Sequence, residues 1–563
     1  MIEGMNPAAI FLAGALLLPF FQEWPRKIII LSIPLFGLAQ LFTLEAGDAG
    51  FIDFLDYRLV TLRIDTLSLV FAAIFHVASF VAALYALQVR DTIQHVAMLV
   101  TAGAAIGAAL AGDLISLFIF WELTAIASVF LIWARRTEQS FSAGMRYLMI
   151  QMGSGLLLLF GTILLARETG SVEFSQMQLG SIATWAIFLG FGIKCAFPLL
   201  HNWLQDAYPE ATVTGTVVLA SFTTKLAIYA LARGFAGESL LIPIGAVMVA
   251  FPIFYAVIEN DLRRVLAYSL NNQLGYMVVG IGLGTQMAIN GAVAHAVNNI
   301  LFKGLLFMSV GAVLLRTGTA KASELGGLYK SMPWTTGFCL VGAASISAFP
   351  LFAGFVSKGM ILAATAEQEH WIVWLVLLFG SAGVFHHSGI KIPYFAFFAH
   401  DSGIRCPEAP GNMLWAMGIV SVLCIAIGVY PGLLYAWLPY PVTFTPYTMD
   451  HVTAQMQLLL FSALAFTLLM RTGIYPPELC ATNLDTDWFY RRLAPACIGF
   501  LERFSAAAAA KLTAAGKLLV QQALALIYHG HGPQGVLART APTGITVLWV
   551  AVLLTAALLL YYL

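Results

Sequence analysis

Five charged residues stand deep inside long apolar stretches of this sequence, and its chemistry has to be sought there. They are Glu122, Lys194, Lys225, Lys303 and Lys358. A charge at the centre of a bilayer costs roughly 2.5–3.5 kcal/mol on the lenient insertion scale, so the unpaired set would cost on the order of 12–17 kcal/mol. A cost of that size indicates a function, and charges inside a membrane typically mark the path of an ion or a proton.

Two further basic residues belong to the same candidate set. His295 precedes Lys303 by eight residues, which places the two on neighbouring faces of one helix about two turns apart. Lys391 lies towards the end of its own apolar stretch. For every member of the set, and above all for Lys391, a structural ion pair or a side chain that snorkels to the membrane surface is the alternative. For His295 taken alone, the alternative is a hydrogen-bonded polar side chain without a further role. We expect His386 and His387 in a loop-like or interfacial setting.

A buried lysine beside a carboxylate is suited to proton transfer. Desolvation weakens proton binding by a lysine and a nearby carboxylate strengthens it, so a change in their separation switches proton affinity. Glu122 and Lys194 are predicted to form such a switch. Protons then pass through water along Lys225, His295, Lys303 and Lys358. Asp206 and Glu210 are predicted as a gate near the cytoplasmic mouth, with ordinary loop acids as the alternative.

Prolines break two of the apolar stretches beside these lysines. Pro198 follows Lys194 by four residues, and proline removes a helical hydrogen bond and clashes with the preceding turn. In lipid, such a break is tolerated only where it is buried in protein or lines a wet cavity. The sequence around it, CAFPLLHNW, is similar to SAFPLFAGF around Pro350, which precedes Lys358. The two breaks lie five spans apart and so run in opposite directions, which is the pattern of an inverted repeat.

The composition is that of a membrane protein built from many helices. Of the 563 residues, 60% are hydrophobic and 10% are charged, which is far from the composition of a soluble domain. Basic and acidic residues balance at 28 each, so nothing favours nucleic acid as a partner. The cysteines show no metal-ligand spacing and there is no phosphate-binding GxxxxGK motif. We therefore expect no metal and no cofactor, and an ion gradient or a partner as the energy source.

Apolar runs of about 17–25 residues predict roughly sixteen membrane spans. They lie near residues 7–21, 27–46, 65–88, 93–111, 113–134, 143–166, 181–204, 212–235, 240–258, 263–283, 287–315, 334–364, 371–399, 412–438, 453–470 and 543–562. With this topology the basic loop residues gather on one side, which predicts an N-terminus outside the cytoplasm. The opening MIEGMNP has no basic region, so we expect no removable signal peptide.

The predicted organisation follows from these spans. It comprises N-terminal helices (1–92), a first five-helix repeat (93–235), a second, inverted one (240–400), C-terminal helices (412–470), an amphipathic cytoplasmic surface helix (486–531) and a final span (543–562). Residues 47–65 alternate apolar and polar side chains, so they form a hairpin on the outer face or an ordered loop. Residues 486–531 form one or two surface helices, or a linker to the last span.

The residues around the buried charges resemble a known family: the proton-translocating, antiporter-like subunits of respiratory complex I, membrane-bound hydrogenases and Mrp-type sodium/proton antiporters. The matching motifs cover about residues 65–400. They are FWELTAIAS around Glu122, GIKCAFPLLHNWLQDAYPEATVTGTVVLASFTTKLAIYALARGF around Lys194 and Lys225, DLRRVLAYSLNNQLGYM at 261–277, HAVNNILFKGLLFM around Lys303, and AFPLFAGFVSK ending at Lys358. DAYPEATVTGTV and HHSGIKIPYFAFF are most similar to the D-type subunit of the Mrp-type complex. The tail after about residue 440 departs from the short form of that D-type subunit and is similar to the lateral-helix extension of the distal complex I subunit.

That resemblance implies fourteen core helices, with inverted repeats at the fourth to eighth and the ninth to thirteenth. It implies the pair Glu122 and Lys194, the central lysines Lys225 and Lys303, and the terminal lysine Lys358. It also implies one subunit of a large hetero-oligomer in a prokaryotic-type inner membrane.

We therefore expect the proton-conducting subunit of an antiporter that exchanges Na⁺ or another monovalent cation for protons, a secondary transporter and not an enzyme. Two alternatives stay open. One is a proton-pumping subunit of a complex I-like or hydrogenase redox complex. The other is the membrane subunit of an inorganic-carbon uptake complex with a zinc-containing partner.

Overall fold

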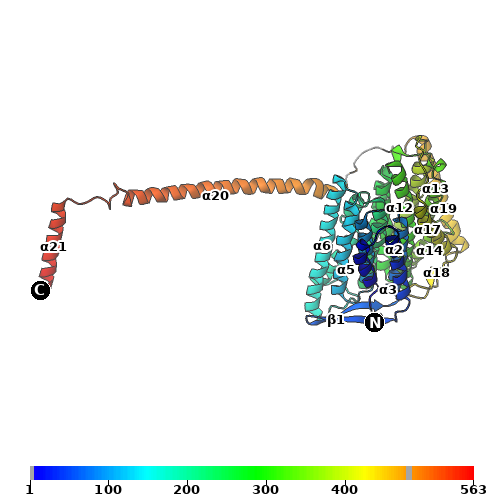
Figure 1. The fold of residues 1–563 in the computed structure, drawn as a ribbon, viewed down its shortest axis with the longest axis horizontal. Helices are drawn as coiled ribbons and strands as arrows, with labels where there is room; N and C mark the ends of the chain where they lie inside the picture. Colours follow the sequence, from blue (N-terminus) through cyan, green and yellow to red (C-terminus); the bar gives the residue numbers. More distant parts are fainter. Residues whose placement is uncertain (1–4, 477, 479–482, 484) are drawn as a thin grey trace. The chain divides into compact units, whose positions relative to one another are not determined.

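The computed structural model describes residues 5–476, 478, 483 and 485–563, and it is almost entirely helical (Figure 1). Within this described part, twelve helices are long and apolar enough to cross a membrane. The predicted fold class, an all-helical polytopic membrane protein, is therefore confirmed. The chain divides into two compact units, the first ending at Asp485 and the second running from Thr486 to Leu563.

The first unit begins with three α-helices, one short 3-10 helix and one hairpin. In chain order they are α1 (Ala8–Leu17), the short η1 (Leu18–Phe20), α2 (Glu23–Leu41), β1 (Gly47–Phe54), β2 (Tyr57–Ile64) and α3 (Thr66–Tyr85). The two strands pair antiparallel, with Gly47 opposite Ile64 and Phe54 opposite Tyr57. Of the two interpretations of residues 47–65, the hairpin is the one found.

Ionic contacts fasten this hairpin to the helices beside it. Arg63 on β2 forms ion pairs with Asp48 at 2.8 Å and with Glu173, in the loop after α6 (Glu138–Thr169), at 3.2 Å. Asp113 accepts a hydrogen bond from the backbone N–H of Val60 at 2.8 Å. The Arg63 guanidinium holds the pKa of the Asp48 carboxyl below its usual value.

The middle of the chain supplies the remaining helices that surround the buried charges. The region predicted as the first repeat contains α4 (Thr92–Ala109), α5 (Leu114–Trp133), α6, α7 (Ile182–Lys194), α8 (Asn202–Ala207) and α9 (Val213–Gly234). The region predicted as the second contains α10 (Leu241–Ile258), α11 (Leu262–Leu283), α12 (Gln286–Thr317), the short η2 (Ala322–Glu324) and η3 (Leu328–Lys330), α13 (Pro333–Ile346), α14 (Ala353–Glu367), α15 (Trp371–Val384), the π-helical η4 (Phe385–Ile390), α16 (Lys391–Pro393) and the π-helical η5 (Tyr394–Phe398).

Local sequence signals fix the ends of many of these helices. At their N-termini, polar side chains accept hydrogen bonds from backbone N–H groups that the first turn leaves unpaired. The capping residues are Asp65, Asp91, Asp113, Thr137, Ser181, Thr212, Asp261 and Thr285. Glycines in the left-handed conformation follow α6, α11 and α12, where a Cβ would be strained.

Two membrane helices are interrupted by the same backbone conformation. The gap between α7 and α8 contains Pro198, and the gap between α13 and α14 contains Pro350. In each gap two non-glycine residues adopt positive φ angles, Ala196 (63°) and Leu199 (69°) in the first, Ala348 (58°) and Leu351 (74°) in the second. Such residues cost about 1–3 kcal/mol each and persist where the surrounding structure fixes them, often at functional sites.

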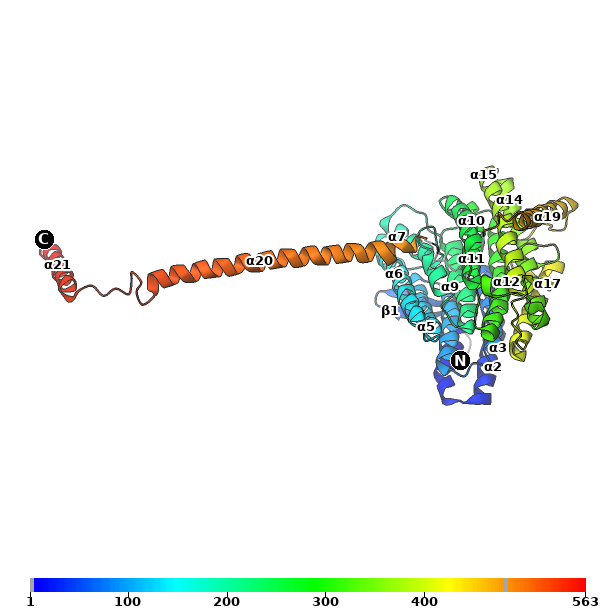
Figure 2. The ribbon, with the colours of Figure 1, turned by 90° about the horizontal axis from the view of Figure 1, so that it is seen from above.

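Three neighbouring helices, α9, α11 and α12, lie at the centre of the first unit, and two of them carry candidate residues, Lys225 on α9 and His295 and Lys303 on α12. α9 is buried along its whole membrane-crossing window, and it packs against both α11 and α12 (Figure 2). The hairpin marks one face of this unit, here named the hairpin face. α10 runs from there to the opposite face, where it meets the start of α11; that side is named the α10–α11 face.

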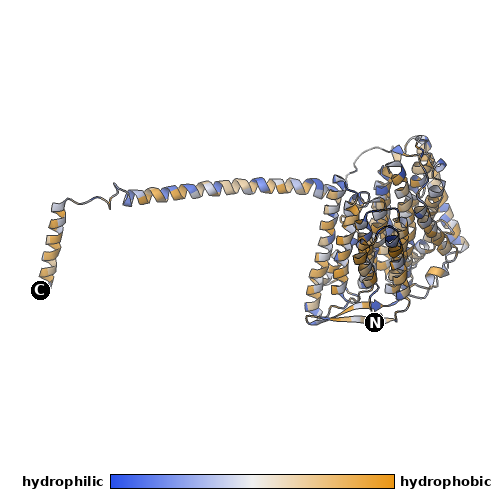
Figure 3. Cartoon of the chain, viewed as in Figure 1, coloured by the Kyte–Doolittle hydropathy of each residue, from blue (hydrophilic) through white to orange (hydrophobic). Residues whose placement is uncertain are grey.

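The first unit closes with α17 (Gly411–Val429), α18 (Gly432–Tyr435) and α19 (Met449–Thr472). The second unit contains the π-helical η6 (Phe489–Leu493), α20 (Ala494–His531) and α21 (Thr543–Tyr562). η6 and α20 run on as one helix. None of the residues in α20 and α21, which are described throughout, is buried within the chain. α21 is mostly apolar whereas α20 mixes polar and apolar residues (Figure 3).

Candidate functional site

Lys194 is the last residue of α7, directly before the first break, and it is fully buried. Its Nζ donates a hydrogen bond to the carbonyl oxygen of Trp121 at 2.9 Å and lies 4.3 Å from the centre of the Trp121 ring. An aromatic face stabilises a desolvated cation by about 2 kcal/mol, and the C-terminal end of a helix also favours positive charge. Lys194 is therefore held by a carbonyl, a ring and a helix end.

Glu122 lies next to Trp121 on α5, close enough to Lys194 for their charges to interact. Nevertheless, within the part of the chain that the structure describes, neither carboxylate oxygen of Glu122 has a hydrogen-bond partner. A buried carboxylate without a partner is costly, so it binds water or a proton, or moves towards the lysine. The two charges are thus close enough to interact, but the carboxylate forms no hydrogen bond with the lysine; this arrangement is here named the open pair.

Gly155 on α6 provides the space that the Glu122 carboxylate occupies. A Cβ built on Gly155 would overlap Oε1 of Glu122. Beside it, Trp121 Nε1 donates to Ser154 Oγ at 3.0 Å, and Ser154 Oγ donates to the Gly190 carbonyl at 2.7 Å. These contacts hold α5, α6 and α7 together around the open pair. Gly155 was not among the predicted site residues, because nothing in the apolar run MGSGLLLLFG marks one glycine for this role.

Lys225 connects the two repeat regions. It is fully buried on α9, so it does not snorkel, and its Nζ donates to the carbonyl of Ala220 at 2.8 Å. Its charge interacts with those of His295 and Lys303 on α12, the helix packed against α9. The predicted residues Glu122, Lys194, Lys225, His295, Lys303, Lys358 and Lys391 are here named the row. The row therefore continues from α9 to α12 across this helix contact.

His295 and Lys303 are both fully buried on α12. Lys303 Nζ donates to the carbonyl of Leu266 on α11 at 3.2 Å. Both ring nitrogens of His295 have polar neighbours, Nδ1 with Ser357 Oγ at 3.1 Å and Nε2 with Gln273 Oε1 at 3.2 Å. His295 is thus held in a hydrogen-bonded chain of neutral side chains.

Lys358 on α14 reaches back across the second break. Its Nζ donates to the carbonyl of Ile346, the last residue of α13, at 3.1 Å, and it lies 5.2 Å from the centre of the Tyr276 ring. Lys194 and Lys358 therefore share one arrangement, in which a buried ammonium is held by a backbone carbonyl and an aromatic ring beside a broken helix.

Lys391 is fully buried behind the π-helical turn η4. Its Nζ donates to the carbonyls of Val257 and Glu259 at 2.7 Å each and of Ala256 at 3.3 Å. It also forms an ion pair with Glu478 at 2.9 Å. The carbonyls at the end of α10 would otherwise lack donors, so Lys391 caps that helix whatever else it does.

The two residues predicted as a gate lie on the α10–α11 face in ion pairs. Arg146 donates to both carboxylate oxygens of Asp206, at 2.6 and 3.0 Å. Glu210 pairs with Arg135 at 3.2 Å. The two acids are therefore tied to α6 and to the end of α5, and a gating movement would have to separate them from their arginines.

Arg263 is buried, although the sequence marks it only as one of the basic loop residues on one side of the membrane. It is 2% exposed and donates to the carbonyls of Pro209 at 2.8 Å and Ala211 at 2.9 Å. It thereby fixes the turn between α8 and α9. Nothing in DLRRVLAYSL distinguishes Arg263 from Arg264, since the rotation of α11 decides which one points inward.

The expectation of a loop-like or interfacial setting is wrong for His387. It lies fully buried in η4, where the charges of Lys303 and Lys391 both reach it. His386 is half-buried against the Phe466 and Tyr475 rings, at centroid distances of 5.1 and 5.6 Å. A π-helical turn continues the helix through HHSGIK and turns His387 inward, and such turns often occur at functional sites.

Several buried amides indicate where water accompanies the charges. Gln151, Gln205 and Asn299 have no hydrogen-bond partner for either amide atom among the described residues. Asn299 lies one turn from Lys303 on α12, and Gln151 lies one turn from Gly155 on α6. Buried polar groups without protein partners are usually satisfied by water, so these side chains support a hydrated path along the row.

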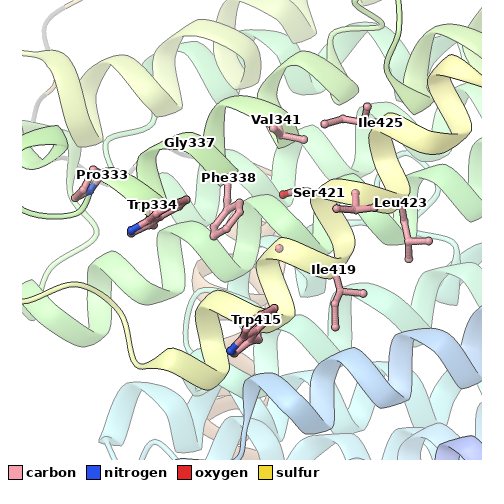
Figure 4. Close-up of a pocket in the computed structure, with 12 residues that line it drawn as sticks. Pro333, Trp334, Gly337, Phe338, Val341, Trp415, Ile419, Ser421, Leu423 and Ile425 are labelled. Carbon is pink, nitrogen blue, oxygen red and sulfur yellow. The ribbon is translucent and has the colours of Figure 1, made fainter.

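A wide groove on the outside of α13 and α17 has a different character. It has a volume of about 1020 Å³ and is lined by Trp334, Phe338 and Trp415, among other residues (Figure 4). Ser421 is the one hydroxyl-bearing side chain of its described lining. A surface this apolar suits a lipid chain or a neighbouring helix and offers no ligands for an ion.

Comparison with known proteins gives a consistent picture. Residues 111–439 match the family model described as NADH:quinone oxidoreductase/Mrp antiporter, TM. Hydrogenase-4 component B of Escherichia coli is 28% identical over 70% of this chain and 65% of its own length. The D-type subunit of the Na⁺/H⁺ antiporter of Alkalihalophilus pseudofirmus is 31% identical over 52% of this chain and 63% of its own length. The chain thus spans somewhat less than two thirds of the length of these curated relatives.

Solved structures share the fold. A chain of the Mrp complex from Dietzia sp. DQ12-45-1b matches with a TM-score of 0.74 and 23% identity, covering 92% of this chain and 62% of that one. A chain of the membrane-bound sulfane sulfur reductase, an archaeal respiratory membrane complex, matches with a TM-score of 0.71 and 22% identity, covering 98% and 99%. Both neighbours are parts of larger membrane complexes.

Proposed function

The chain belongs to the NADH:quinone oxidoreductase/Mrp antiporter transmembrane family, and on that premise we propose that it is the proton-conducting subunit of a multisubunit antiporter. The complex would exchange Na⁺ or another monovalent cation for protons across a prokaryotic-type inner membrane, with the N-terminus of this chain on the outer side. The other membrane subunits of the complex would be its partners.

The observation that carries this proposal is the open pair of Glu122 and Lys194 beside a broken helix. When the carboxylate approaches Lys194, it stabilises the ammonium and the proton stays. When it withdraws, desolvation favours the neutral amine and the proton passes on through water. Because Glu122 has no hydrogen-bond partner in the described chain, little holds it back from such a movement.

The proposed path continues through Lys225 to the second repeat region. Lys225, His295 and Lys303 interact across the α9–α12 contact, and Lys303 and Lys358 also interact. Neighbouring cations disfavour each other, so a proton that arrives at one lysine promotes release from the next. Lys391 is proposed as the last basic group of the row, and Asp206 and Glu210 as groups that control access from the α10–α11 face.

Cation-driven proton flux in inverted vesicles that carry the intact complex tests this function. We expect a sodium pulse to drive flux in the native complex, and Lys194→Ala and Glu122→Gln to lower it by roughly tenfold or more. Glu367→Gln, an exposed acid at the end of α14, is the matched control and leaves flux unchanged. Unchanged flux in both core variants, at equal assembly, would show that the pair is structural.

A second candidate function is a proton-pumping subunit of a redox-driven complex. The similarity to hydrogenase-4 component B favours it, and one chain of a respiratory membrane complex shares the fold over its full length. The two functions differ in the energy source, because a redox complex moves protons when its electron-transferring partner is supplied with donor, with no need for a sodium gradient. Purification of the complex with its neighbours, followed by donor-driven and sodium-driven flux, distinguishes them.

We propose different roles for the two long helices of the second unit, α20 and α21, on the basis of their composition. α21 is strongly apolar, has no charged residue and is 20 residues long, which is enough to cross a bilayer. α20 mixes polar and apolar residues, which suits a helix lying on the membrane surface. Protease accessibility of tags placed at Gly516 and after Leu563, in sealed vesicles of known orientation, tests both assignments.

A further inference from the structure

A carboxylate from outside the repeats is inserted at the base of the second one. Glu478 lies in the segment between α19 and α20, its side chain is 7% exposed, and its Oε1 is 2.9 Å from Nζ of the buried Lys391. From the same segment, Asn483 Nδ2 donates to Glu259 Oε2 at 3.3 Å. The segment therefore reaches the end of α10 at two described points.

On the other side of Lys391 lies His387. It is buried, precedes Lys391 by four residues, and has no side-chain hydrogen-bond partner in the described chain. The next residue, Ser388, donates to Ser269 Oγ on α11 at 2.7 Å. α11 also provides the carbonyl that holds Lys303, and the charges of Lys303 and Lys391 both reach His387. The imidazole of His387 thus lies within electrostatic reach of both Lys303 and Lys391.

We propose that Glu478 is the carboxylate through which the second repeat exchanges protons with water at the α10–α11 face, and that His387 and Lys391 link it to Lys303. For release at the α10–α11 face, a proton leaves Lys391 Nζ for Glu478 Oε1, giving a neutral amine and a carboxylic acid. Glu478 then releases that proton to water and becomes a carboxylate again. Lys303 gives a proton to the neutral imidazole of His387, and the imidazolium passes it to the neutral amine of Lys391, so that His387 returns to its neutral form. This proposal rests on the proposed function, since it assigns a further point at which the same path exchanges protons with the α10–α11 face.

The surroundings of Glu478 suit an exchanging group. The charged and titratable groups that act on it are Lys391, Glu259 and Tyr475, and Arg264 Nη1 lies 3.9 Å from Glu259 Oε2. Burial raises the pKa of Glu478 although Lys391 opposes that shift. A carboxyl with a raised pKa takes up and releases protons nearer to neutral pH than an exposed glutamate does.

A purely structural role is the competing explanation, because Lys391 caps α10 and Glu478 pairs with it. Proton flux per assembled complex separates the two, with Glu478→Gln, Glu478→Asp, His387→Gln and the control Glu367→Gln in inverted vesicles. We expect Glu478→Gln and His387→Gln to lower flux by roughly tenfold and Glu478→Asp to restore most of it with a shifted pH profile. Full flux with an unchanged pH profile in Glu478→Gln, while Lys194→Ala is inactive, would overturn the proposal and leave the proposed function standing.

If the native complex shows no flux, the proposed function is refuted. The role of Glu478 is then tested by a measurement that does not depend on transport. A hydrophobic carbodiimide modifies protonated buried carboxyls, and peptide mass spectrometry of the intact complex reports the modified fraction of Glu478 between about pH 5 and pH 9, a range that brackets a raised carboxyl pKa. We expect modification of the native residue to fall as pH rises, and Lys391→Met to raise it several-fold at neutral pH. Modification that is independent of pH and of Lys391 would overturn the assignment.

Discussion

Each repeat region contains one broken helix, but the two regions differ in where the carboxylate that accompanies their lysines comes from. In the first, Glu122 belongs to α5 and stands open beside Lys194. In the second, backbone carbonyls hold Lys303 and Lys358, and the carboxylate that pairs with Lys391 comes from residue 478, beyond the repeat. One repeat carries its acid within its own helices, whereas the other obtains it from a connecting segment.

This difference has a physical consequence for each lysine. A lysine beside an acid of its own repeat can be switched by a small side-chain movement. Lysines held only by carbonyls gain no full opposite charge, so their protonation depends on neighbouring cations and on water. The first repeat is therefore suited to switching and the second to relaying.

Removal of one lysine from each region is expected to give the largest contrast. Lys303→Met and Lys194→Met should both abolish flux, but their stabilities should diverge. Lys303→Met removes a buried cation and replaces it with an apolar chain, so we expect a gain of about 1–3 kcal/mol. Lys194→Met leaves Glu122 without its counter-charge and should give no gain. Thermal unfolding in detergent checks this, and equal shifts in both variants would remove the proposed distinction.

Gly155→Ala should stop proton switching between Glu122 and Lys194 by steric overlap alone, without a change of charge. The new Cβ overlaps the Glu122 carboxylate, so the acid must leave its site, and overpacking of this kind costs about 1–3 kcal/mol. We expect flux to fall as far as in Glu122→Gln. Gly153→Ala is the matched control on the same helix, because its Cβ meets nothing within 4 Å. If both variants transport alike, the space beside Gly155 has no role.

Ala196→Gly and Ala348→Gly probe what the two regions share. Both residues have positive φ angles, 63° and 58°, and relief of a left-handed conformation is worth about 1 kcal/mol. We expect a similar stabilisation from each substitution, measured as a rise in the unfolding temperature of the purified complex. A gain at one break only would show that the breaks are not equivalent.

The smallest expected effect concerns the surface contacts beside the first region. Arg63 holds the pKa of Asp48 below its usual value, so this pair stabilises the fold above the pKa of an unfolded aspartate, about 4, and the contribution is lost as pH falls towards the lower folded value. Because Asp48 is partly exposed, the effect is about 0.5 kcal/mol. We expect Asp48→Asn to lower the unfolding temperature slightly at about pH 6 and to have a smaller effect at about pH 3, below the unfolded pKa.

Much of this arrangement could be predicted from the sequence because it depends on local chemistry. Hydropathy predicted roughly sixteen spans, and twelve helices of the described chain are long and apolar enough to cross a membrane. Prolines marked the two breaks, and charges inside apolar runs identified Glu122, Lys194 and Lys303 as residues in need of an explanation. Capping residues such as Asp113 and Thr285 likewise act within one helical turn. Each of these signals is complete within about twenty residues, the length of one span.

Contacts between distant segments were decided by the tertiary structure alone. The space beside Gly155, the burial of Arg263, the inward turn of His387 and the pairing of Lys391 with Glu478 all depend on how helices rotate and pack against one another. A hydropathy pattern specifies that a helix is buried but does not fix which residue on another helix it meets. The sequence therefore determined which charges enter the membrane, and packing determined which partners receive them.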